Sequence, residues 1–107
     1  MIKRRRTKKH EALRLLQKVT EDSVFWASNG AVLRNLHDLA EVLGAMTEEH
    51  YKTHANYEKN DFSNWLREVV RDEILAKEIV HARNRESAAK KVRERITLLE
   101  GMTPKNA

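Results

Sequence analysis

Very little in this chain interrupts a helix. Its one proline is Pro104, close to the C-terminal end of the 107 residues, and its three glycines are Gly30, Gly44 and Gly101. Proline and glycine are the residues that most disfavour a helix interior. Hydrophobic residues make up 40% of the chain and charged residues 35%, a balance that suits amphipathic helices around a small core. We therefore predict an all-α fold, in one domain.

Apolar residues recur at the 3.6-residue spacing of an amphipathic helix along most of the chain. The stripes in chain order are Ala12, Leu13, Leu16 and Val19; Val32, Leu33, Leu36, Leu39, Ala40, Leu43 and Met46; Tyr51, His54 and Ala55; Phe62, Trp65, Leu66 and Val69; Leu75, Ile79 and Ala82; and Ala88, Val92, Ile96 and Leu99. Such stripes need a common interior, so we predict a compact single-domain bundle of five or six short helices. Its core should contain Leu36, Leu39, Leu43, Phe62, Trp65 and Ile79.

Polar residues mark the expected ends of these helices. Asp72 and Glu73 begin one helix, and Gly101 and Pro104 end the last. Residues 21–30 break the pattern and end on an Asn-Gly pair suited to a tight turn or a helix entry. Phe25 and Trp26 should be anchored in that irregular segment. The expected divisions are a flexible basic leader at 1–10, a helical domain at 11–101 and a tail at 102–107. The expected N-caps are Thr47, Asn60 and Asn84.

Charge is distributed in blocks. Residues 1–18 have a net charge of +7, residues 19–80 a net charge of −6, and residues 81–107 a net charge of +4. The total of +5 therefore conceals two basic ends around an acidic middle. Basic blocks of this kind bind polyanions, or contact an acidic surface on the same chain or on another copy.

The basic ends are the best functional lead. Cations in such a leader bind phosphates and release counterions, and the last helix supplies a second cluster. The sequence lacks a recognition-helix, zinc-finger or stacking-sheet signature, so contacts to the backbone of DNA or RNA are expected rather than sequence reading. The candidate residues are Lys3, Arg4, Arg5, Arg6, Lys8, Lys9, Arg83, Arg85, Lys90, Lys91, Arg93 and Arg95.

Several classes of function have little support. Cysteine is absent, so neither a disulfide framework nor a thiolate metal site is available, and a cytoplasmic location is expected. No apolar run approaches the roughly 20 residues of a membrane span, and no h-region follows the basic start. The glycines form no phosphate loop, and the serines lie in no elbow or triad pattern. We therefore expect no enzyme, no cofactor and no small-molecule substrate.

Two histidines raise the question of a metal. His50 and His54 are four residues apart on an expected helix, with Glu58 or Asp61 as a third ligand. The zinc-protease pattern needs a glutamate directly after the first histidine, and Tyr51 stands there instead. The preferred interpretation is that His54 faces the core and hydrogen-bonds the helix start near Asp61, that His50 is solvated, and that no metal is bound.

Three further residues allow two interpretations each. Asp61 could be a catalytic acid, but an aspartate in a first helical turn is explained by capping and dipole effects. Phe62 and Trp65 could present a stacking face for bases, but they share a stripe with Leu66 and Val69. The structural interpretation is preferred for all three.

Residues 25–79 contain a series of features in a fixed order. They are an aromatic pair, a glycine, a Leu-rich helix, a histidine before Asp-Phe, a tryptophan three residues after that Phe, and an acidic-Leu-Ala turn. This region resembles a family of uncharacterised small helical domains, found mainly in archaea, with a His…Asp-Phe…Trp signature. Several relatives have glycine where Asn60 stands here, and the basic leader and last helix lie outside the shared part. The resemblance implies a helical fold and no assigned reaction. The signature residues are Phe25, Trp26, Gly30, His54, Asn60, Asp61, Phe62 and Trp65.

Two hypotheses from different classes follow. The first is a small protein that associates with nucleic acid through phosphate contacts. The second is a protein-interaction or regulatory module, which uses the acidic middle surface to bind a protein partner or a second copy.

Overall fold

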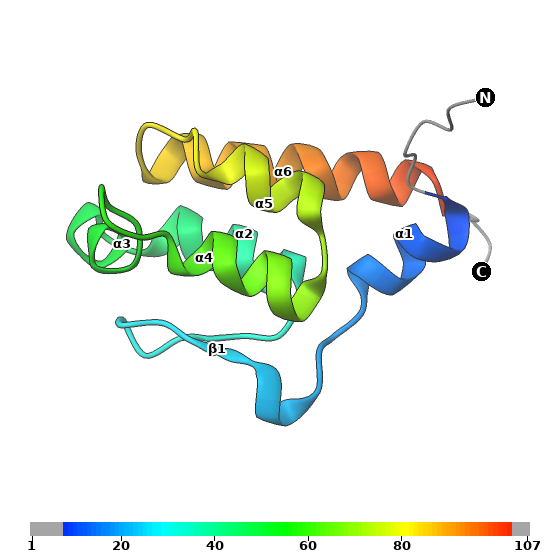
Figure 1. Ribbon diagram of the computed structural model, residues 1–107, viewed down its shortest axis with the longest axis horizontal. Coiled ribbons are helices and arrows are strands. Elements are labelled where there is room, and N and C mark those ends of the chain that lie inside the picture. Colours follow the sequence, from blue (N-terminus) through cyan, green and yellow to red (C-terminus); the bar gives the residue numbers. More distant parts are fainter. Residues whose placement is uncertain (1–7, 104–107) are drawn as a thin grey trace.

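The structure is a computed structural model that describes residues 8–103. These residues contain six α-helices, two short irregular helical segments and one small hairpin (Figure 1). The elements are α1 (Lys9–Leu16), η1 (Glu21–Ser23), β1 (Phe25–Trp26), β2 (Val32–Leu33), α2 (Leu36–Ala45), α3 (Glu48–His54), α4 (Asp61–Trp65), η2 (Leu66–Val70), α5 (Glu73–Ile79) and α6 (Arg85–Gly101). The predicted helical class is therefore confirmed in outline, whereas a purely α fold is not.

Side-chain caps fix the starts of most helices. Thr47, Asn60 and Asn84 accept hydrogen bonds from backbone N–H groups three residues on, as predicted, and Asp72 caps α5 in the same way. Asn35 is a further cap, because its side chain accepts from the Asp38 N–H at 2.9 Å. These bonds satisfy donors that have no partner inside the helix.

The segment before α2 is a hairpin, in place of the predicted irregular segment up to Gly30 and the predicted helix from Val32. Phe25 pairs with Leu33 and Trp26 with Val32 in an antiparallel register. Gly30 has a φ of +92°, a conformation that glycine adopts without a steric penalty, and it closes the turn. The prediction that the second helix begins near Val32 was wrong because this turn reverses the chain first.

The core is shared by all the helices, and α2 and α6 are its most extensively packed pair. Leu36, Leu39 and Leu43 of α2 are fully buried, and α6 lies along α2 and also contacts α1 and α5. Figure 1 shows α6 along one side of the molecule and the hairpin on the opposite side, with α2 and α4 between them. The six predicted core residues, Leu36, Leu39, Leu43, Phe62, Trp65 and Ile79, all belong to this one buried cluster.

A wide helical turn changes the register of the stripe after Trp65. Segment η2 has π-helical geometry, which adds one residue to a turn. Val70 is therefore buried, while the predicted Val69 is only half-buried. Arg71 then adopts a left-handed conformation with φ +69°, and the chain turns into α5.

The first helix also differs from its prediction. It begins at Lys9, so the last two residues of the predicted leader belong to α1. Ala12 and Leu15 are its buried residues, whereas Leu13 is exposed, because the side of α1 that faces α6 is rotated from the predicted stripe. Among the residues that the structure describes, no helix combines the length and apolar character needed to cross a membrane.

Candidate nucleic-acid interface and the histidine cluster

Four of the signature residues, Phe25, His54, Phe62 and Trp65, pack together around the buried ring of Phe62. The ring of Phe62 stacks against Phe25 at a centroid distance of 5.1 Å and contacts the His54 ring at 5.3 Å. Trp65 packs edge-on against Phe25 at 6.0 Å, and its indole N–H donates to the Ser23 carbonyl at 2.9 Å. These aromatic residues lock α3, α4 and the hairpin together. Phe62 and Trp65 are buried, so they do not form an exposed face for stacking bases.

Trp26 does not belong to this cluster. Its neighbour Phe25 points inward, and successive side chains of a strand point to opposite faces. Trp26 therefore lies outside the core, with 70% of its surface exposed. The prediction that both aromatic residues are anchored was wrong for Trp26.

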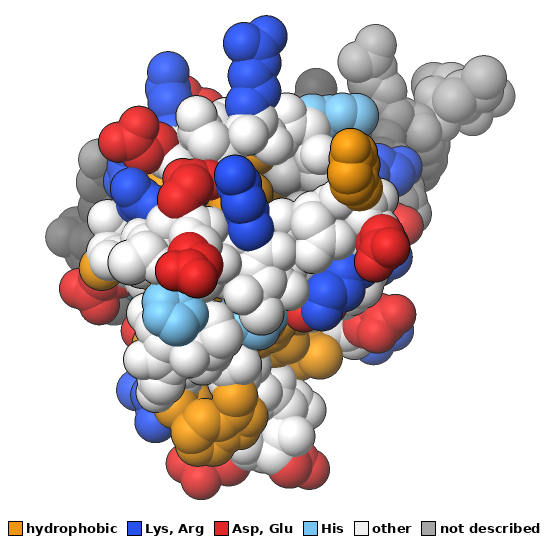
Figure 2. Space-filling model, turned by 90° about the vertical axis from the view of Figure 1, so that its left-hand side faces the viewer, with side chains coloured by type: hydrophobic (Ala, Val, Ile, Leu, Met, Phe, Trp, Pro, Cys, Tyr) orange, Lys and Arg blue, Asp and Glu red, His pale blue; other side chains and the backbone are white. Residues whose placement is uncertain are grey.

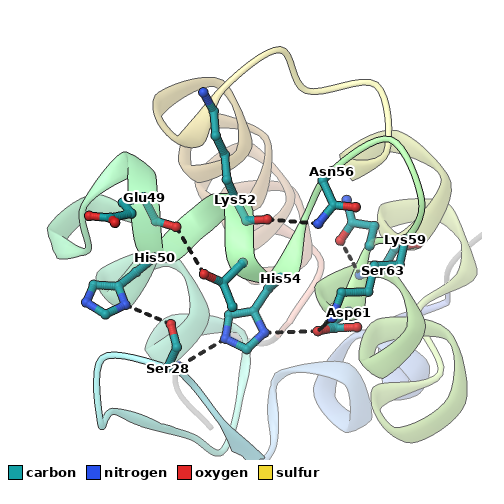
Figure 3. Close-up of polar contacts among 11 residues, drawn as sticks. Ser28, Glu49, His50, Lys52, His54, Asn56, Lys59, Asp61 and Ser63 are labelled. Carbon is teal, nitrogen blue, oxygen red and sulfur yellow. Dashed lines mark hydrogen bonds and ion pairs between the residues drawn. The ribbon is translucent and has the colours of Figure 1, made fainter.

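The ring nitrogens of His54 are both occupied (Figure 3). The Ser28 backbone N–H donates to Nε2 at 3.0 Å, so Nε2 is the acceptor and the proton lies on Nδ1. Nδ1 in turn donates to Asp61 Oδ2 at 3.0 Å. The predicted bond from His54 to the helix start is confirmed, and no lone pair of this ring is left for a metal ion.

His50 contacts the hairpin and is not simply solvated. Its Nδ1 lies 2.8 Å from Ser28 Oγ, so Ser28 links the two imidazoles (Figure 3). A Ser-His-Asp relay needs the hydroxyl and the carboxylate on one imidazole, but here Ser28 Oγ contacts His50 and Asp61 contacts His54. Sequence reasoning missed this role of Ser28, since it depends on how the hairpin folds back onto α3.

Asp61 carries the charge of this cluster. Its Oδ2 also accepts from Lys59 Nζ at 3.0 Å. Burial raises the pKa of Asp61, but hydrogen bonds from His54 and Lys59 outweigh it and hold the pKa below its usual value. The capping side chain is that of Asn60, one residue earlier, and Asp61 supplies negative charge to the first turn of α4. No group of three His, Asp and Glu side chains suited to a metal ion occurs within residues 8–103.

Arg95 is not part of a surface cluster, contrary to the prediction. It is buried, its Nε donates to Asp72 Oδ2 at 2.8 Å, and its Nη2 donates to Asp72 Oδ1 at 3.0 Å. The helical rotation between positions 93 and 95 turns this side chain toward the start of α5. Asp72 is itself buried and caps α5.

Arg85 also has an internal role. Its Nη1 donates to the Leu43 carbonyl at 2.7 Å, which satisfies a free acceptor in the last turn of α2. Its Nε lies 3.9 Å from a Glu48 carboxylate oxygen. Arg85 therefore joins α2, α3 and α6 and has little of its charge left for an external ligand.

The other predicted cations in and just before the last helix remain at the surface. Arg83, Lys90 and Arg93 are exposed and Lys91 is half-buried. None of these four forms an ion pair within the described part of the chain. Figure 2 shows the end of the molecule that carries α3, where Lys and Arg side chains are interspersed with acidic ones.

The leader cations Lys3, Arg4, Arg5 and Arg6 lie outside the described residues, whereas Lys8 and Lys9 are exposed at the start of α1. Five of the 21 Lys and Arg residues lie outside residues 8–103, and all 16 Asp and Glu lie within that range. The described body therefore holds 16 residues of each sign and is neutral in formal charge. The whole net charge of the chain comes from its two ends.

Comparison of the chain with models of known protein families, with curated proteins and with solved structures finds no match. The resemblance to the archaeal helical domains stays a prediction.

Proposed function

We propose that this chain associates with nucleic acid through phosphate contacts, made by the basic leader and assisted by the exposed cations of α6. The observation that supports the proposal is that Arg83, just before α6, and Lys90 and Arg93 on α6 are exposed and have no ion-pair partner within residues 8–103. Lys90 and Arg93 are three residues apart on one helix, so their side chains are neighbours. The leader cations of this proposal are Lys3, Arg4, Arg5, Arg6, Lys8 and Lys9.

Because residues 8–103 have no net formal charge, the leader should provide most of the electrostatic attraction to a nucleic acid. Each neutralised phosphate releases a counterion, and affinity then falls with salt at a slope set by the number of contacts. If about five phosphates are contacted, the log–log slope should be near −3.5 for single strands and −4.5 for duplexes. Phosphate contacts position the ligand without reading its sequence, so different sequences should bind similarly.

The experiment measures binding of labelled duplex and single-stranded oligonucleotides by fluorescence anisotropy at several salt concentrations. Substituting Arg4, Arg5 and Arg6 together by glutamine should weaken binding to all sequences and reduce the slope by about two to three. A matched control replaces Arg34, Arg67 and Lys77 by glutamine, which removes the same charge from the middle of the chain. The control should have the smaller effect.

Two results would count against the proposal. No detectable binding at about 50 mM salt excludes phosphate contacts of this number. An equal loss in the control variant means that only the net charge matters and that the leader is not the site.

The second candidate function is a protein-interaction module that uses the acidic middle surface. The observation in its favour is on α5, where Glu73, Ile74 and Glu78 are all exposed and the Ile74 side chain is 43% accessible to water. An apolar residue between acidic ones suits a basic, partly apolar partner. Absence of oligonucleotide binding, together with a change in self-association on Ile74→Lys, would favour this candidate.

A further inference from the structure

A concave site lies beside α3, away from the histidine cluster. It has a volume of about 380 Å³ and is bounded by α3, the turn at 56–59 and the chain that follows α5. Its apolar lining includes Tyr51, Ala55 and Ala82. Sites for small ligands have volumes of roughly 300–1,000 Å³, so this one is large enough for a single nucleobase.

Tyr57 stands at the rim of this concavity. Its side chain is 98% exposed, so the ring contributes almost nothing to the core. The turn that carries it is nevertheless well fixed. The Asn56 N–H donates to the Lys59 carbonyl at 2.8 Å, and Ala55 and Asn60 form a bridge below the turn. The backbone of the turn thus holds an aromatic ring in water, where both of its faces are free to stack on a base.

Two cations also line the concavity. Lys52 comes from α3 and Arg83 from the segment before α6, and neither forms an ion pair within residues 8–103. The lining has one carboxylate, that of Glu48, which accepts from the Arg85 N–H at 3.3 Å and also faces the Arg85 guanidinium. The negative charge of Glu48 is therefore offset, and the site has a positive balance.

The amide side chains at the site are already committed to the turn. Asn56 Nδ2 donates to the Lys52 carbonyl at 2.9 Å, as Figure 3 shows, and Asn56 Oδ1 accepts from the Glu58 N–H. Asn60 Oδ1 accepts from the Ser63 N–H at 3.0 Å. Both amide oxygens therefore already accept a hydrogen bond from the backbone, so recognition would depend mainly on stacking and charge.

We infer that this concavity binds one unpaired base of a single-stranded nucleic acid, which stacks on Tyr57 while Lys52 and Arg83 contact the flanking phosphates. This inference rests on the proposed function, since it assigns a base site to a chain proposed to bind phosphates. A duplex keeps its bases stacked on each other, so the site favours single strands.

The test compares a 12-nucleotide single strand with a 12-unit abasic strand that has the same phosphates and no bases. Anisotropy titrations are made with DNA and with RNA strands. The strand that binds with the higher affinity is the preferred one. Wild type should bind the base-bearing strand roughly 5- to 150-fold more tightly than the abasic one, as one stacked base implies. Tyr57→Ala should lose this preference, whereas Tyr57→Phe should keep most of it.

Trp26→Ala is the matched control, because it removes another exposed aromatic residue that does not line the concavity. It should retain the preference for bases. A preference that survives Tyr57→Ala, or that Trp26→Ala removes equally, would overturn the base site while leaving the phosphate contacts in place. Failure to bind any strand, abasic included, would overturn the base site and the proposed function together.

Discussion

Two aspartates begin neighbouring helices, and each contacts a basic side chain from another part of the chain, but water reaches them very differently. The side chains of Asp72 and Arg95 are 1% and 4% exposed, whereas those of Asp61 and His54 are 29% and 12% exposed. Asp72 accepts two bonds from Arg95 in a bidentate arrangement. Asp61 instead shares one oxygen between His54 and Lys59.

The difference in exposure determines what each pair contributes. A buried charge cannot be solvated when its partner is lost, so the Asp72–Arg95 pair holds α5 and α6 in one arrangement. Water can replace a lost partner of Asp61, so that pair adds less stability. The pair instead positions the hairpin, because the His54 ring also accepts the Ser28 N–H and so joins the hairpin to α3.

The largest expected effect is at the buried pair. Arg95→Met keeps an apolar stem but leaves the Asp72 carboxylate buried without its guanidinium, which should lower the free energy of unfolding by about 3–5 kcal/mol. Arg93→Met, two residues earlier on the same helix and exposed, should change it by less than about 0.5 kcal/mol. Urea denaturation measures the free energy of unfolding of both variants. Equal values would disprove the expected difference between the buried and the exposed arginine.

In the Asp61 region, aromatic packing should outweigh the ion pair. Trp65→Ala removes a buried indole and its hydrogen bond to Ser23, and should cost about 3–5 kcal/mol. Trp26→Ala removes an exposed indole and should cost less than about 0.5 kcal/mol. Thermal melting of the two variants compares them directly. An unchanged melting temperature for Trp65→Ala would refute the assignment of Trp65 to the core.

A smaller loss is expected at His54. His54→Ala removes two hydrogen bonds and a ring contact with Phe62, but the freed Ser28 N–H is exposed to water, so the cost should be about 1–2 kcal/mol. The control is His37→Ala, since the pair between His37 and Glu100 is half exposed and should contribute less than about 1 kcal/mol. If His54→Ala lowered the free energy of unfolding as much as Arg95→Met, the expected difference in stability between the Asp61 and Asp72 pairs would be disproved.

The smallest expected effect is a pH dependence at Asp61. Its pKa is lowered in the folded chain, so its contribution is present above the unfolded pKa, about 3.9, and is lost as pH falls through the folded value. Wild type should therefore lose its advantage over Asp61→Asn below about pH 4. Urea unfolding of both proteins from pH 7 to pH 3 measures this. A difference in stability that is constant over this range would contradict the lowered pKa.

The candidate interface shows how far sequence reasoning reaches. Charge blocks located the basic ends correctly, because counting charges needs no structure. They did not separate Arg93, which is exposed, from Arg95, which is buried, although both were candidates. Side chains two positions apart on a helix point in directions about 200° apart, so one can be buried while the other is exposed. The elements that pack against the helix decide which of the two is buried. Tyr57 was missed as well, since a single aromatic residue in a turn carries no sequence signal of its exposure.

Local interactions were determined by the sequence itself. The caps at Thr47, Asn60 and Asn84 act within three residues, so their types and spacing were sufficient to predict helix starts. The amphipathic stripes likewise predicted most of the core, since burial of apolar area needs only that the stripes meet, although they placed Leu13 and Val69 there wrongly.

Contacts between distant residues were decided only by the tertiary structure. Asp72 and Arg95 are 23 residues apart, and Ser28 and His54 are 26 apart. The π-helical turn after Trp65 replaced Val69 by Val70 in the core, and the hairpin turned Trp26 outward. In each case the outcome depends on packing against another element of the fold, and the neighbouring residues do not specify which element that is.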